Sequence, residues 1–357
     1  MQTSKSVKRI NSLQGLRFFF CILIIVNHIV GSSVNFEFGG ECGVSFFFIL
    51  SGFILSYVYG SSIENDSFST RRLFTHQLSK FLPLHVTLLL LMTLAYYHAD
   101  HYVPWDKFFT NLFLVQSWIP SDYYFLSING VTWFLCDILF FYLCFHGMYN
   151  VAMKSGRGRL TAIVVVVLCV YVVIMVLTPE ENINNFLYAN PIIRLADCFF
   201  GIILCRFYKS ETGRKIAGRI NGKSSIFIDA VSLALLALLV GMCFAYYGFL
   251  PHRLTAASFF WPYMLFIVFW YVSVDDRTDS VFVRIVKCPF AVGMGNVSME
   301  VYISQSCTIL YLNTILDHFG IYRGHLLFVF IVEMIAVNFV GWVAHQAFSR
   351  LRIFKRY

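Results

Sequence analysis

The chain has 357 residues, of which 58% are hydrophobic and only 13% are charged, and its mean hydropathy is +0.70. A soluble protein of this size carries about twice that charged fraction, so the composition excludes a set of soluble domains and predicts a bundle of membrane helices. The net charge of +8 does not by itself indicate nucleic-acid binding. The ten cysteines include no CxxC pair and no Cys/His cluster at metal-ligand spacing, so the sequence predicts neither a metal site nor a disulfide framework.

Ten apolar runs follow one another along the chain, each long enough to cross about 30 Å of hydrocarbon. They occupy residues 13–34, 43–60, 81–99, 130–150, 160–178, 191–208, 226–248, 256–274, 291–316 and 324–348. A shorter run at 108–119 predicts an interfacial or re-entrant segment. Because the connecting segments are short, we expect an all-α polytopic membrane protein in which residues 1–357 form a single integral-membrane domain, with no soluble C-terminal domain.

The positively charged residues lie almost entirely on one side of this arrangement. With a cytoplasmic N-terminus, the inner segments hold 21 Lys and Arg residues and the outer segments hold three, while three more lie within helices. This asymmetry follows the positive-inside rule and predicts that both termini are cytoplasmic. It also assigns the net charge to a cytoplasmic rim, so no nucleic-acid partner is expected.

The first apolar run carries two ionisable residues, Arg17 and His28. Eleven residues advance an ideal helix by about 1100°, so the two side chains lie about 20° apart around the axis and about 16 Å apart along it. The predicted orientation places Arg17 near the cytoplasmic end and His28 in the outer half. Ionisable groups inside a membrane are costly and therefore indicate function. The alternative is that Arg17 reaches the headgroups and His28 makes a packing contact.

Further ionisable residues interrupt later apolar runs. Asp137 lies about two turns below the outer end of the fourth run, and Arg194 and Asp197 are i, i+3 neighbours near the outer end of the sixth. The topology allows these three residues and His28 to share a similar depth. Asp137 favours a functional role, whereas Arg194 and Asp197 are typical of a structural ion pair. Glu300, part-way along the ninth run, can equally well bond a neighbouring helix.

The chemistry that suits this set is acyl transfer to a hydroxyl group. A neutral imidazole at His28 can take the proton of an attacking alcohol, and a carboxylate, from Asp137 or Glu41, can hold the ring in the right tautomer. A cation at the inner end, Arg17 with Lys80 as a second candidate, can hold an anionic donor that approaches from the cytoplasm. The chain contains no GxSxG segment, so a serine nucleophile is not indicated.

At these residues the sequence resembles the membrane acyltransferase-3 family of bacterial polytopic proteins. The resemblance covers most of the chain and rests on five segments that occur in the family's order. These are the R-x10-H spacing of Arg17 and His28, the FFxxSG signature at Phe47, Phe48, Ser51 and Gly52, TWFLCDILFFY with Trp133 and Asp137, RLADCFFG with Arg194 and Asp197, and GNVSMEVYISQS with Glu300.

The resemblance implies transfer of an acyl group, usually acetyl, from a cytoplasmic acyl-CoA to surface or exported glycans. It also implies that His28 is catalytic and that Arg17 serves the donor. The chain departs from the family pattern at several positions. Lys80 is one cation where the family often has an Arg-x-x-Arg run, and the acidic positions carry Asp where Glu is common. Gln305 stands where many members have a late His, so we assign it no proton transfer.

The sequence therefore predicts an O-acetyltransferase of the bacterial inner membrane, with acetyl-CoA as donor substrate and no permanently bound cofactor or metal. The expected partners are acyl-CoA, membrane lipids and a lipid-linked or surface glycan such as lipopolysaccharide O-antigen. A transporter or flippase of lipid-linked glycans is one alternative, because intramembrane His, Arg and acidic residues also suit proton coupling. The sequence has no internal repeat of the kind common in transporters. A scaffold subunit of a glycan-synthesis complex is the other alternative.

Overall fold

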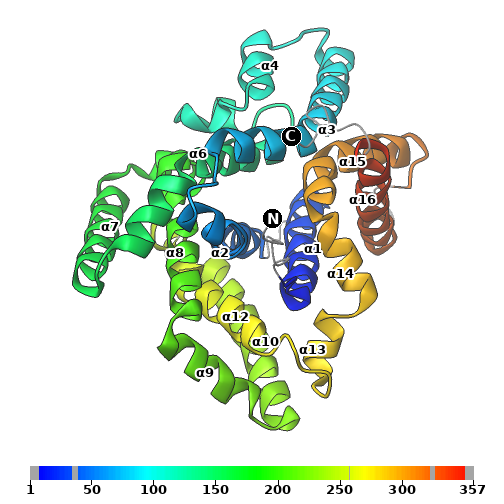
Figure 1. Cartoon of the computed structure of the whole chain (residues 1–357). Coiled ribbons are helices and arrows are strands. Elements are labelled where there is room, and N and C mark those ends of the chain that lie inside the picture. Colours follow the sequence, from blue (N-terminus) through cyan, green and yellow to red (C-terminus); the bar gives the residue numbers. More distant parts are fainter. Residues whose placement is uncertain (1–7, 34–38, 257, 322–325, 350–357) are drawn as a thin grey trace.

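A computed structural model describes residues 8–33, 39–256, 258–321 and 326–349 of the chain. The secondary structure of this part consists of helices (Figure 1). The α-helices are α1 (Asn11–Ser33), α2 (Gly40–Glu64), α3 (Thr70–Asp100), α4 (Trp105–Leu112), α5 (Asp122–Phe125), α6 (Trp133–Lys154), α7 (Arg157–Leu177), α8 (Pro191–Lys209), α9 (Glu211–Asn221), α10 (Ser225–Gly248), α11 (His252–Thr255), α12 (Trp261–Ser273), α13 (Val281–Val286), α14 (Pro289–Asn296), α15 (Ser298–His318) and α16 (Leu326–Phe348). Short turns of other helix types are η1 (Gln116–Trp118), η2 (Gly130–Thr132), η3 (Glu180–Asn182), η4 (Asn184–Tyr188) and η5 (Ser258–Phe260).

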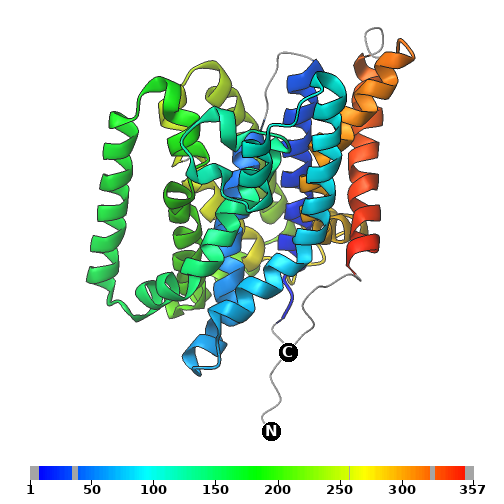
Figure 2. The same cartoon turned by 90° about the horizontal axis from the view of Figure 1, so that it is seen from above.

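The long helices run between two ends of the molecule (Figure 2). We call the end at which α1 and α3 begin and α2 and α16 end the basal end, and the opposite one the apical end. Helix α1 packs against α2, α14 and α15, and α2 packs in turn against α8 and α6. The prediction of an all-α polytopic membrane protein is thus confirmed.

The predicted number of ten membrane spans is not confirmed. Within the described residues, seven helices are long and apolar enough to cross a membrane, or eight if α8 and the bent segment before it form one span. The apolar run at 291–316 is divided between α14 and α15, and α15 carries polar residues such as Glu300 and Gln305. The run at 256–274 forms an apolar helix only from Ser258 to Ser273, which is short for a span.

Glycines allow α2 and α8 to cross with their backbones in contact. A Cβ atom at Gly52 would lie 1.9 Å from the carbonyl oxygen of Cys198, and one at Gly201 would lie 2.0 Å from that of Ile49. Any larger side chain would therefore force the helices apart. Small residues at such crossings are typical of helix pairs inside membranes, because close backbone approach maximises van der Waals contact.

The basal start of α1 is held by polar contacts. The backbone N–H of Ser12 donates to Oδ1 of Asp275 at 2.8 Å, which satisfies one of the unpaired N–H groups that begin a helix. The hydroxyl of Ser12 donates to the carbonyl of Tyr271 at 2.9 Å. Since Arg17 follows within two turns, these contacts also fix its position.

The segment between α3 and α6 folds into a unit in the apical half of the molecule, which we call the cap. Nδ2 of Asn111 donates to Ser127, and Nε2 of Gln116 donates to Thr132 at 3.2 Å, all of them buried. Asn129 extends the cap to the bundle, because its Nδ2 donates to the carbonyl of Ile303 on α15 at 3.0 Å. The run predicted at 108–119 lies in this cap, as part of α4 and η1.

Candidate active site

The FFxxSG segment divides its side chains between two faces of α2. Phe47 and Ser51, four residues apart, line a cavity at the basal end. Phe48 and Gly52, also four residues apart, face the other way: the Phe48 ring stacks on Phe134 with centroids 4.6 Å apart, and Gly52 meets α8. Residues four apart lie on one face of a helix, so this segment both lines the cavity and packs the bundle.

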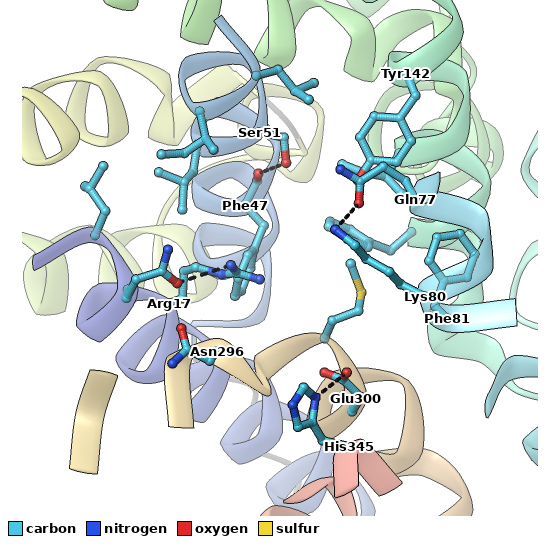
Figure 3. Close-up of a pocket in the computed structure, with 18 of the residues that line it drawn as sticks. Arg17, Phe47, Ser51, Gln77, Lys80, Phe81, Tyr142, Asn296, Glu300 and His345 are labelled. Atoms are coloured by element: carbon cyan, nitrogen blue, oxygen red, sulfur yellow. Dashed lines mark hydrogen bonds and ion pairs between the residues drawn. The ribbon is translucent and has the colours of Figure 1, made fainter. Parts of the chain in front are cut away.

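The basal cavity has a volume of about 420 Å³ and lies between α1, α2, α3, α6, α15 and α16 (Figure 3). This size falls in the range of roughly 300–1,000 Å³ that is usual for small-molecule sites. Of the residues predicted from sequence, it brings together Arg17, Phe47, Ser51, Lys80 and Glu300. Its two cations come from different helices, α1 and α3, which gives the cavity a surface suited to an anionic ligand.

Neighbouring side chains hold the two cations in place. Nη1 of Arg17 donates to Oε1 of Gln14 at 3.3 Å, and Nζ of Lys80 donates to Oε1 of Gln77 at 3.0 Å. Both acceptors are neutral amides that also line the cavity, so neither contact cancels a positive charge. Arg9 bonds Asn296 at the edge of the cavity and adds a third cation.

The carboxylate of Glu300 lies in the same cavity as these cations. Nδ1 of His345 lies 2.8 Å from Oε1 of Glu300 across the antiparallel pair α15 and α16 (Figure 3). Glu300 also interacts electrostatically with Arg17. The expectation that Glu300 bonds a neighbouring helix is therefore met by His345, while its carboxylate still lines the cavity.

A second cavity of about 920 Å³ opens at the apical end between α1, α3 and α15. His28 lines it from α1. Its lining is largely apolar near the middle of the bundle, where Met92 and Ile309 contribute, and more polar toward the apical end, where His98 and Asp100 contribute. Arg17 and His28 therefore belong to two cavities at opposite ends of one helix.

The His28 ring is held in one tautomer by its own helix. Nδ1 lies 2.8 Å from the carbonyl oxygen of Ile24. A carbonyl only accepts hydrogen bonds, so Nδ1 carries the proton of the neutral ring and Nε2 carries the lone pair that can take up a proton. The sequence predicted a carboxylate for this task. The Asp137 carboxylate has no hydrogen-bond partner among the described residues, so it does not hold the ring in this structure.

Asp137 instead belongs to a buried charged group with Arg194 and Asp197, all three with 0% exposure. Nη2 of Arg194 lies 3.3 Å from Oδ1 of Asp197 and donates to Ser45 at 3.2 Å. The guanidinium also lies 4.9 Å from the centre of the Phe48 ring. Asp137 interacts electrostatically with both charged partners. The positive charge of Arg194 thus lies near two buried carboxylates, Asp137 and Asp197. None of the three residues is among those that line the two cavities.

Two other predicted residues lie at the apical side of the core. Trp133 is buried at the start of α6, where its ring centroid lies 4.9 Å from that of Tyr188. Glu41, in the first turn of α2, is half-buried and interacts electrostatically with Tyr188 and Tyr246. Neither Trp133 nor Glu41 is among the residues that line the two cavities.

Some polar residues at or near these sites were missed by the sequence analysis. Glu333 is fully buried on α16, where it interrupts an apolar run just as Asp137 does, so the same rule would have found it. Tyr142 and His345 line the basal cavity. No sequence signal identifies these two, since their role depends on which helix faces the cavity.

The comparisons with known proteins agree with the geometry. A family profile described as an acyltransferase domain matches residues 10–344, a range that includes Arg17, His28 and Glu300. The chain belongs to the acyltransferase-3 family. Membership of the acyltransferase-3 family confirms the resemblance predicted from sequence, and an acyltransferase is the class of enzyme that it supports.

A curated relative supports the same class. The protein named acyltransferase MdmB, from Streptomyces mycarofaciens, is 29% identical over 236 residues, which are 58% of this chain and 60% of the relative. The chain thus spans less than two thirds of that relative's length. No solved structure matches the chain significantly.

Proposed function

We propose that this protein is a membrane O-acyltransferase. It moves an acetyl or other acyl group from acyl-CoA, bound from the cytoplasm, to a sugar hydroxyl of a lipid-linked or surface glycan such as lipopolysaccharide O-antigen, in the bacterial inner membrane. The observation that carries the proposal is that Arg17 and His28, on one helix, line cavities at opposite ends of the bundle. A donor and an acceptor from opposite sides of a membrane require such an arrangement.

The basal cavity suits the donor. Acyl-CoA carries several phosphate charges, and Arg17, Lys80 and Arg9 supply cations around this cavity. Most other Lys and Arg residues of the chain fall in segments at the basal end, which supports a cytoplasmic position for it. The apolar side chains of Phe47 and Phe81 provide a surface for the uncharged arm that carries the acyl group.

The apical cavity suits a membrane-linked acceptor. Leu94 and Leu310, from α3 and α15, line it and are 48% and 39% exposed, so its wall continues into the lipid-facing surface. An apolar anchor can follow this surface, and polar residues such as His98 and Asp100 can meet the sugar. The lateral opening therefore supports a lipid-linked glycan as acceptor.

In the proposed reaction, Nε2 of His28 takes the proton of the acceptor hydroxyl. The hydroxyl oxygen attacks the thioester carbon and forms a C–O bond, and the tetrahedral intermediate then expels the thiolate as the C–S bond breaks. His28 returns the proton to the thiolate sulfur, so an ester and a free thiol leave. The contact of Nδ1 with Ile24 keeps the basic nitrogen at Nε2 throughout.

The test is acyl transfer by the purified protein in lipid nanodiscs, with radiolabelled acetyl-CoA and a lipid-linked glycan extract of the native host. We expect His28→Ala to lower kcat by about 10²–10⁴-fold, as for loss of a general base. Arg17→Ala should chiefly raise KM for acetyl-CoA, by about tenfold or more, since charged contacts contribute about 1.5–3 kcal/mol. Lys107→Ala is the matched control and should change neither, because this apical cation lies over the Tyr123 ring and is not among the residues that line the two cavities. Full transfer by His28→Ala would refute the mechanism.

Two cavities at opposite ends also fit a transporter of lipid-linked glycan, which is the second candidate. Deleting the gene separates the two functions. Loss of acetyl groups from an otherwise complete surface glycan, measured by NMR, supports the enzyme. Loss of the whole glycan supports the transporter.

A further inference from the structure

Helix α15 is shared by both cavities. Met299 and Glu300, in its first turn, line the basal cavity, and Ser306 and Ile309 line the apical one. Gln305 lies in the stretch between the two sets. Gln305 is not among the residues that line either cavity, but an acyl group that passes from a donor in one cavity to an acceptor in the other crosses the level of this stretch.

Gln305 is a buried amide without a partner. It has 0% exposure, and neither Oε1 nor Nε2 has a hydrogen-bond partner among the described residues. Leaving a buried polar group unsatisfied costs about 1–3 kcal/mol, so such groups need an explanation. Leu or Met would fill the same space without this cost. A substrate group that bonds the amide during the reaction explains why a glutamine is present.

The register of α1 and α15 places Gln305 at the level of His28. The two helices pack together and both run from the basal toward the apical end (Figure 2). The thiol of Cys21 lies 3.6 Å from the carbonyl oxygen of Ser298, which sets these two residues at one level. His28 and Gln305 each follow seven residues later, so both lie about 10 Å further along and within about 20° of the starting direction. They therefore occupy the same level on facing helices.

Helix α15 is bonded to the apical cap just before Gln305. Asn129 donates to the carbonyl of Ile303 at 3.0 Å, and the hydroxyl of Tyr302 donates to the carbonyl of Val131 at 3.0 Å. Both contacts are buried. These bonds hold the helix that carries Gln305, and a donor on a fixed helix needs little rearrangement when charge develops, which is what makes such donors effective in catalysis.

We propose, on the basis of the proposed function, that Gln305 is a catalytic residue whose Nε2–H group stabilises the oxyanion. As the hydroxyl oxygen bonds to the thioester carbon, the π electrons of the C=O bond move to the carbonyl oxygen, and Nε2 of Gln305 donates to that oxygen. His28 holds the hydroxyl proton meanwhile. When the C=O bond re-forms and the thiolate leaves, the amide is released unchanged. Gln305 transfers no proton.

The test replaces Gln305 by methionine, which has similar length and no hydrogen-bonding amide. With radiolabelled acetyl-CoA and the lipid-linked glycan extract, we expect Gln305→Met to lower kcat by about 10²–10³-fold, as for removal of one oxyanion donor. KM for acetyl-CoA should stay within about twofold, because the bond forms in the transition state. Tm should stay the same or rise, since an unsatisfied buried amide has been removed.

The matched control is Gln116→Met. Gln116 is equally buried, but its Nε2 donates to Thr132 at 3.2 Å within the cap. Its replacement should lower Tm and leave kcat per folded molecule within about twofold. A kcat of Gln305→Met equal to that of the wild type would overturn the proposal, as would a lower Tm with kcat per folded molecule unchanged. If the wild type itself transfers no label, both the proposed function and the role of Gln305 are refuted. If His28→Ala is inactive while Gln305→Met retains full activity, the proposed function stands and the role of Gln305 is refuted.

Discussion

Individual polar residues in this protein have two kinds of surroundings. Arg17 and Lys80 donate to neutral amides, and both line a cavity. Arg194 has the opposite surroundings, since it is fully buried beside Asp197. A charged residue in an apolar run can therefore belong to a cavity or to a buried ion pair, and only its neighbours show which of the two applies.

The buried charged group leads to a prediction about stability. Arg194→Leu should destabilise the protein by about 3–5 kcal/mol, because it leaves Asp137 and Asp197 buried without a cation. Asp137→Asn should leave Tm unchanged or raise it, because the carboxylate has no hydrogen-bond partner in the described part of the chain. Thermal unfolding of the purified variants provides the measurement.

A double variant tests the reason for that loss. Arg194→Leu combined with Asp197→Leu removes the pair together, and replacing a buried ion pair by apolar residues is often close to neutral. The double variant should therefore recover part of the Tm that Arg194→Leu loses. A double variant less stable than Arg194→Leu alone would contradict the view that the uncompensated charge causes the loss.

Among the elements, α2 performs two tasks at once. Phe47 and Ser51 line the basal cavity, while Phe48 and Gly52 pack against α6 and α8. The short signature is informative because the 3.6-residue period assigns alternate members to the two faces. A substitution in it therefore affects either the cavity or the packing, according to its face.

The crossing of α2 and α8 gives a prediction at this scale. Gly52→Ala places a methyl group 1.9 Å from the backbone of α8, so we expect a loss of about 1–3 kcal/mol and a lower Tm. Gly147→Ala in α6 is the control, because a Cβ there meets nothing within 4 Å. That change should leave Tm unchanged or raise it, since alanine favours a helix by about 0.5–1 kcal/mol over glycine. Equal effects on Tm would show that close approach is not the reason for Gly52.

The whole molecule is a helical bundle with one cavity at each end. This arrangement assigns the donor to the basal end and the acceptor to the apical end, provided that the basal end faces the cytoplasm. The distribution of Lys and Arg along the chain supports that orientation.

Cysteine labelling tests the orientation directly. The background is Cys144→Ser with Cys169→Ser and Cys288→Ser, which removes the three thiols that are not buried. In intact cells, a membrane-impermeant maleimide should label Tyr102→Cys, at an exposed apical position, and not Ser67→Cys, at an exposed basal one. After permeabilisation both should react. The reverse pattern in intact cells would invert the orientation and exclude a cytoplasmic donor site at the basal cavity.

Much of the architecture could be predicted from the sequence. The errors occur where an apolar run is long enough to span a membrane but contains a turn or polar residues. Long apolar runs such as 43–60 and 160–178 correspond to α2 and α7 because no charged residue interrupts their hydropathy. The run at 291–316 was wrong as a single uninterrupted element, since the chain turns between α14 and α15 at Val297. Hydropathy averages over such a break and does not detect it.

The sequence by itself determined the class of protein, the family, and the shared face of Arg17 and His28, because composition, motif order and helical period are local properties of the chain. Only the tertiary structure decided which helices surround each residue. It separated Arg17 and His28 into two cavities, placed Asp137 with Arg194, and set Gln305 at the level of His28. Such contacts join residues on different helices, and they follow from helix packing, which no local pattern records.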